Sequence, residues 1–139
     1  MIFENATTRT KQGDIGEARA IYEYSRMGYV VSKPLCDSAK YDLVIEDQNG
    51  KLLKVQVKTS NHSILNQAEV FTVQLATTGG NTKVNTTRLR QSNDYDILFV
   101  LTGNDQCFSI PVEALEGAKR SINVNCVHKR SKYLKYRIN

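Results

Sequence analysis

The sequence predicts an α/β fold in which an N-terminal helix packs on a mixed sheet of about five strands. An amphipathic stretch suited to a helix occupies residues 11–27. Two apolar runs of strand length follow within 41–59, on either side of an Asn-Gly pair, and a continuous apolar run occupies 95–101. Shorter helical pieces should complete the fold.

The first helix should run over residues 11–27, with Thr10 or Asp14 as its N-cap and Gly28 at its end. A single stripe at helical spacing collects Gly13, Glu17, Ala20, Ile21, Tyr24 and Gly28. An acid on such a stripe is costly unless it is paired or bound to a cation, which makes Glu17 a candidate site residue. The alternative is a surface acid that the helix dipole favours in the first turns.

The register of the hairpin at 41–59 follows from its apolar pattern. A two-residue Asn49-Gly50 loop would mix polar and apolar side chains on both faces. A three-residue loop, 48–50, with Gly50 in the left-handed region gives one wholly apolar face. In that register Asp42 lies opposite Gln56, with Lys58 farther along the same face.

The remaining strands are expected from alternation and from turn residues. A strand over 29–34 can lie at the edge of the sheet, because Pro34 stops it. Others are expected at 70–75, 95–101 and 107–110, with a turn at 103–105 and a short helix beginning at Pro111.

Residues 77–93 show no periodicity and are rich in Thr, Asn and Gly, so we expect a long loop. Its cations are Lys83, Arg88 and Arg90. The loop can contact DNA through amides, hydroxyls and cations, or it can be a mobile solvated segment.

The basic tail, residues 128–139, interleaves cations with tyrosines. Lys129, Arg130 and Lys132 are its candidate phosphate ligands. A final strand with an exposed charged face is the alternative, and both interpretations can hold together.

Bulk composition narrows the class of protein. A length of 139 residues suits one domain, and a net charge of +5 favours a polyanionic partner. Three scattered cysteines argue against a disulfide framework or a zinc knuckle. No apolar run approaches the roughly 20 residues of a membrane span, and residues 1–10 lack the basic-then-apolar layout expected of a secretory signal. We therefore expect a cytoplasmic, nucleoid-associated protein.

Asp42 followed by Gln56-Val57-Lys58 resembles the PD-(D/E)xK nuclease motif, with Gln56 in place of the usual second acid. The helix that carries Glu17 matches the place where many of these nucleases have a further acid. The arrangement is similar to the small family of group I intron-encoded PD-(D/E)xK homing endonucleases, and more distantly to archaeal-type Holliday junction resolvases. A looser similarity follows at 96–112, where Asp96 is expected to be structural.

The resemblance implies a restriction-endonuclease-like core in one nuclease domain, 1–139, that cleaves DNA with Mg²⁺, for which Mn²⁺ would substitute. The implied catalytic residues are Glu17, Asp42, Gln56 and Lys58, and the implied metal ligands are Asp42, the Val57 backbone carbonyl and Glu17. The partner would be double-stranded or branched DNA, bound by a homodimer or homotetramer. A site-specific homing-type enzyme is the first hypothesis. A junction resolvase and a non-catalytic DNA-binding protein on a nuclease scaffold are the alternatives.

Overall fold

A computed structural model of the chain describes residues 1–64, 67–81, 84–125 and 131–139. Its elements, in chain order, are α1 (Arg9–Arg26), β1 (Val30–Ser32), β2 (Leu43–Glu46), β3 (Leu52–Ser60), β4 (Ser63–Ile64), β5 (Gln67–Gln74), β6 (Thr77–Asn81), β7 (Val84–Arg88), β8 (Ile97–Thr102), β9 (Cys107–Pro111), the 3-10 turn η1 (Val112–Leu115), β10 (Ser121–Asn125) and the 3-10 turn η2 (Leu134–Tyr136).

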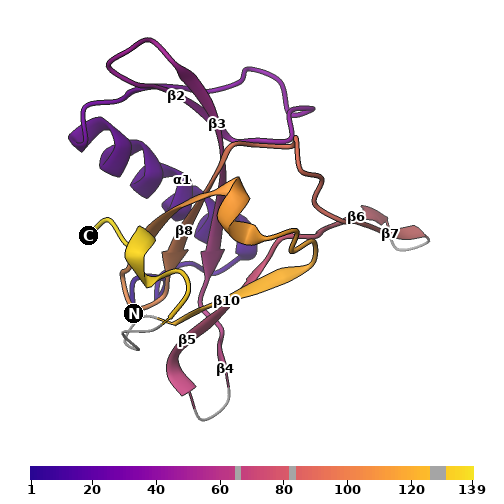
Figure 1. Ribbon diagram of the computed structural model, residues 1–139. Coiled ribbons are helices and arrows are strands. Elements are labelled where there is room, and N and C mark those ends of the chain that lie inside the picture. Colours follow the sequence, from indigo (N-terminus) through magenta and orange to yellow (C-terminus); the bar gives the residue numbers. More distant parts are fainter. Residues whose placement is uncertain (65–66, 82–83, 126–130) are drawn as a thin grey trace.

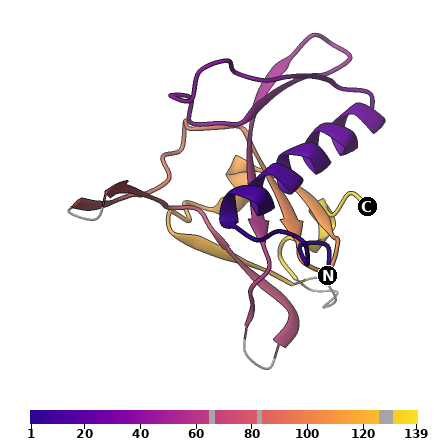
Figure 2. The same ribbon diagram turned by 180° about the vertical axis from the view of Figure 1, so that it is seen from behind.

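The central sheet has five strands in the order β1-β2-β3-β8-β9, with β3 and β8 parallel and the other neighbours antiparallel. Helix α1 lies across one face of this sheet, while β5 and β10 belong to a second, three-stranded sheet (Figures 1 and 2). The α/β class, with about five strands and an N-terminal helix, is therefore confirmed.

Strand β8 shows how the sheet is buried on both faces. Phe99 and Leu101 belong to the core cluster that contains the α1 residues Ala20 and Tyr24. Leu98 and Val100 belong to the opposite cluster, together with side chains of β5 and β10. Strands covered on both sides read as continuous apolar runs, which is why 95–101 was recognisable in the sequence.

The limits of helix α1 differ from those expected. Thr8, rather than Thr10 or Asp14, is the N-cap, and its Oγ1 accepts a hydrogen bond from the backbone N of Lys11 at 3.1 Å. The helix therefore begins two residues earlier than 11–27. Gly28, with φ of +92°, ends it as expected.

The prediction of a loop at 77–93 is wrong for most of that range. Strands β6 and β7 pair antiparallel and form a hairpin that extends from the body of the molecule (Figure 1). Its threonines are β-branched and suit strands, but the glycines among them interrupt the alternation that predicts a strand. This is why the sequence pattern did not predict β6 and β7 as strands.

Two other parts of the chain depart from expectation. Strand β10 was not predicted, although its buried Ile122 and Val124 alternate with polar residues. The final strand proposed for the tail is wrong for residues 131–139, which form η2 and a single bridge between Phe108 and Arg137. Within the described ranges, no helix is long and apolar enough to cross a membrane.

Candidate active site

The hairpin formed by β2 and β3 has the register expected from its apolar pattern. Leu43 pairs with Val55 and Ile45 with Leu53, and Gly50 has a φ of +79° in the turn. Asp42 consequently faces Gln56. Its Oδ2 accepts hydrogen bonds from Gln56 Nε2 at 2.8 Å and from the backbone N of Val57 at 2.7 Å.

The carboxylate of Asp42 is half-buried, and its pKa is raised above the ordinary value. Burial is the main cause, and the negative charge of Glu17 adds to it. The hydrogen bond from the backbone of Val57 and the charges of Lys58 and Lys33 oppose the rise. Within the described residues Asp42 Oδ1 accepts no hydrogen bond, so this oxygen is free to bind a cation.

Lys58 lies beyond Gln56 on the same face of β3 and is also half-buried. Burial lowers the pKa of its ammonium, and the charge of Asp42 partly opposes this effect. Its Nζ forms no hydrogen bond or ion pair with any residue that the structure describes. A desolvated cation without a bound partner is suited to an anionic group of a substrate.

Helix α1 approaches β3 most closely at Gly16. A Cβ placed on Gly16 would lie 2.3 Å from Thr59 Cγ2 and 3.3 Å from Val57 Cγ1. Nearby, Gln12 Nε2 donates to Thr59 Oγ1 at 2.8 Å. These contacts fix the height of the helix above the sheet, and with it the position of Glu17.

The buried stripe of α1 is rotated relative to the one expected. Gly13 has no neighbour in contact range of a Cβ, and Ile21 is exposed. The buried members are Gly16, Ala20, Glu23 and Tyr24. Glu17 therefore lies at the border of the buried face and is partly exposed.

The side chain of Glu17 reaches the site past the ends of the short strands β1 and β2. The helix covers the apolar face of the hairpin, whereas Gln56 and Lys58 point to the other face. Because β1 stops at Ser32 and β2 begins at Leu43, the sheet is open beside Asp42. Glu17 and Asp42 accordingly line the same cavity.

Lys33 is a residue of this region that the sequence reasoning missed. Its Nζ donates a hydrogen bond to Glu17 Oε1, and the two form an ion pair. The pairing of Ser32 with Val44 carries the residue after β1 toward the start of β2. Applying the register argument to the edge strand as well as to the hairpin would have brought Lys33 to the site.

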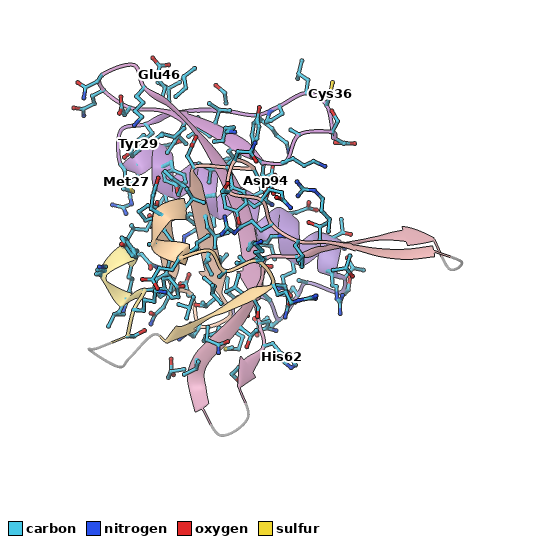
Figure 3. All side chains as sticks on the ribbon, turned by 45° about the vertical axis from the view of Figure 1, so that its right-hand side comes forward. Met27, Tyr29, Cys36, Glu46, His62 and Asp94 are labelled. Atoms are coloured by element: carbon cyan, nitrogen blue, oxygen red, sulfur yellow. The ribbon has the colours of Figure 1, made fainter. Side chains whose placement is uncertain are left out.

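The shared cavity has a volume of about 850 Å³ and is lined mainly by polar side chains. All four predicted catalytic residues, Glu17, Asp42, Gln56 and Lys58, line it. Other lining residues come from the start of α1, the end of β3 and β5: Arg9, Thr10, Gln12, Gly13, Asp14, Val57, Thr59, Ser60, Asn61, His62, Thr72 and Gln74. Figure 3 labels His62 among them.

The predicted DNA-binding cations have different surroundings. Arg88 forms a bidentate pair with Asp94, with both N–O distances 2.8 Å. Arg90 is buried, and Lys132 pairs with Glu116. The candidates Lys83, Lys129 and Arg130 lie outside the described residues.

Asp96 has the structural role expected of it. Its Oδ2 accepts the backbone N–H of Lys54 at 2.8 Å, and its own N donates to the carbonyl of Lys54 at 2.9 Å. These bonds tie the start of β8 to β3, away from the cavity.

The donor atoms present suit a hard divalent cation. In the described part of the chain, no three His, Cys, Asp or Glu side chains gather where they could hold a metal ion. A metal would therefore depend on two carboxylates, Asp42 and Glu17, and on a backbone oxygen such as that of Val57. All of these are oxygen ligands, which Mg²⁺ prefers together with retained waters.

The acid, amide and lysine of one hairpin thus lie beside an acid-bearing helix, which is the arrangement that the resemblance to a nuclease implies. A family model described as PD-(D/E)XK endonuclease matches residues 7–137, and the chain belongs to this family. Among solved structures it is similar to the bacterial homing endonuclease I-Ssp6803I, with 30% sequence identity and a TM-score of 0.76. The match covers 94% of this chain and 88% of that one. No curated protein matched the chain.

The close approach at Gly16 gives a matched pair of variants. Gly16→Ala should lower the free energy of unfolding by about 1–3 kcal/mol, because the new methyl overlaps Thr59. It should also reduce nuclease activity, because the helix and Glu17 are displaced. Gly13→Ala meets no neighbour and should stabilise by about 0.5–1 kcal/mol through helix propensity. Denaturant unfolding of both variants tests this, and equal effects would contradict the packing argument.

Proposed function

We propose that the chain, acting as one nuclease domain over 1–139, is a Mg²⁺-dependent DNA endonuclease of the site-specific homing type. The observation that carries the proposal is the convergence of Asp42, Lys58 and Glu17 on one polar cavity. The similarity to a homing endonuclease at 30% identity supports the type of enzyme. An excess of cations, which gives a net charge of +5, supports a polyanionic substrate.

In this proposal Asp42, Glu17 and the Val57 carbonyl hold the metal. When bound, Mg²⁺, or Mn²⁺ in its place, supplies charge neutralisation at the scissile phosphate and lowers the pKa of an attacking water. Lys58 places its ammonium beside the phosphate and stabilises the negative charge that develops there. Glu17 adds the second negative charge that the hairpin lacks.

In this proposal Gln56 orients the carboxylate of Asp42 rather than binding the metal. Because its Nε2 donates to Asp42 Oδ2, the amide orients that carboxylate and leaves Oδ1 toward the metal. A glutamate here would bring a further negative charge beside Asp42. The Gln-x-Lys form therefore keeps one carboxylate on the hairpin and depends on Glu17 for the second.

We further propose that the enzyme assembles as a homodimer or homotetramer, because a duplex has two strands to cut and a symmetric assembly of small domains presents one site to each strand. A DNA substrate would place it in the cytoplasm, at the nucleoid. The β6–β7 hairpin, which extends from the body, would read part of the target together with the basic tail.

The test offers a library of random duplexes and a four-way junction side by side, each with Mg²⁺ and with EDTA. Cleavage of a subset of duplexes at one recurring sequence, only with Mg²⁺, is the expected result. Preferential cutting of the junction irrespective of sequence would identify a resolvase instead. Tight DNA binding with no cutting of either substrate would favour a non-catalytic scaffold and reject the proposal.

A further inference from the structure

A second cavity adjoins the candidate active site. It has a volume of about 340 Å³ and shares Asp42, Gln56 and Lys58 with the larger cavity. Figure 3 labels one lining residue of each, His62 for the larger cavity and Asp94 for the smaller. A chain-like substrate that enters one cavity can therefore continue past the shared residues into the other.

Arg90 lines the second cavity and is only 4% exposed. Its Nε donates to the backbone carbonyl of Ala118 at 2.8 Å, whereas its buried Nη1 has no hydrogen-bond partner. It forms no ion pair with any residue that the structure describes. A guanidinium stays charged, and its burial is costly without a counter-charge. Binding of an anion in this cavity would therefore be favourable.

Tyr95 supplies a second donor in the same cavity. It is 4% exposed, and its hydroxyl is buried without a hydrogen-bond partner. Burial raises the pKa of Tyr95 to about 12, and the nearby charge of Arg90 opposes that rise. The phenol therefore keeps its proton and can donate a hydrogen bond to an anion.

The acids of this cavity do not neutralise Arg90. Asp94 is engaged by both terminal nitrogens of Arg88 and by the backbone N of Gln91. Asp37 and Lys40 line the cavity at exposed positions, where solvent screens them. Asp42 faces Gln56 and the backbone of Val57. Among the described residues Arg90 therefore keeps no counter-charge of its own, whereas Lys58 shares the cavity with Asp42, whose charge acts on it.

We propose that the second cavity is a phosphate subsite, in which Arg90 and Tyr95 bind the backbone phosphate next to the scissile one. The assignment to a nucleic-acid strand rests on the proposed nuclease function, whereas the affinity for phosphate does not. An anionic group with several acceptor oxygens satisfies both unpartnered donors at once. The subsite would position the strand so that the following phosphate lies beside Lys58.

The first arm of the test follows thermal unfolding in EDTA as inorganic phosphate replaces chloride at constant ionic strength. A ligand that binds only the folded state raises the unfolding temperature, so the wild type should gain stability as phosphate is added. Arg90→Gln should lose most of this gain. Arg120→Gln, which removes an exposed cation, is the matched control and should keep it.

Tyr95→Phe separates binding from folding, because Arg90→Gln also breaks the bond to Ala118. This change deletes only an unpartnered hydroxyl, so the variant should unfold at the same or a higher temperature without phosphate. It should nevertheless lose at least half of the gain that phosphate gives to the wild type. A gain of equal size in wild type and both variants, or none in the wild type, would overturn the subsite.

The second arm measures DNA binding in EDTA against salt concentration, and cleavage with Mg²⁺. Loss of one phosphate contact in Arg90→Gln should reduce the salt slope by about one and slow cleavage. An Arg90-dependent response to phosphate with unchanged DNA binding would overturn the assignment to a strand. If the wild type cleaves no DNA while the phosphate response depends on Arg90, the nuclease proposal fails and the phosphate site stands.

Discussion

Replacing Lys58 by methionine should lower the rate of DNA cleavage by a factor on the order of 100 to 1,000, because the developing charge on the phosphate loses its cation. The effect should fall on the chemical step. Methionine preserves the apolar stem and removes an ammonium whose pKa burial already lowers, so the fold should be equally or more stable. Single-turnover cleavage with Mg²⁺, at saturating enzyme, measures the effect.

The control for this experiment is Lys51→Met. Lys51 lies exposed in the turn of the same hairpin, and its loss removes the same charge at a distance from the cavity. The affinity for DNA should fall by a similar small factor in Lys58→Met and Lys51→Met, because each variant loses one positive charge. Equal cleavage rates for Lys58→Met and the wild type would remove Lys58 from the mechanism.

Glu23→Gln should destabilise the fold by about 2–3 kcal/mol, because Arg26 loses its counter-charge and Arg19 is left with its pair to Asp105. Glu23 is 2% exposed, and its carboxylate accepts hydrogen bonds from Arg19 Nε at 2.9 Å and from Arg26 Nη2 at 2.7 Å. Both arginines reach solvent, which limits the loss. Urea unfolding at neutral pH measures it.

The ionisation of Glu23 should also make the stability of the fold depend on pH. Burial raises its pKa, but the hydrogen bonds from Arg26 and Arg19 outweigh this effect and leave the pKa lowered. A carboxylate with a lowered pKa stabilises the fold above its unfolded-state pKa, near 4. That contribution disappears as the pH falls through the lowered value. The wild type should therefore lose more stability on acidification than Glu23→Gln, whereas the exposed variant Glu4→Gln should follow the wild type.

The part of the site that was predictable from sequence is the part fixed by local register. Strand alternation allows only one pairing that buries Leu43, Ile45 and Val55 together, and this pairing brings Asp42 opposite Gln56. The core strand at 95–101 was equally recognisable. Local pattern therefore determined the hairpin and its chemistry.

Features that depend on tertiary contacts were harder to predict. Gly16, rather than Gly13, meets β3 because the helix starts at Arg9 and its rotation is set by packing. The ion pair between Lys33 and Glu17 joins an edge strand to a helix. The burial of Arg90 depends on a carbonyl 28 positions later in the chain. Sequence spacing within one element carries none of this information.

The most direct test of the metal site compares the unfolding temperatures of the wild type and Asp42→Asn with Mg²⁺, with Mn²⁺ and with EDTA. In EDTA the variant should be as stable or more stable, because a half-buried carboxylate beside Glu17 becomes neutral. Metal at 100 times its dissociation constant should stabilise the wild type by about 2.7 kcal/mol and leave the variant almost unchanged. Equal stabilisation of both proteins by the metal would contradict a site built on Asp42.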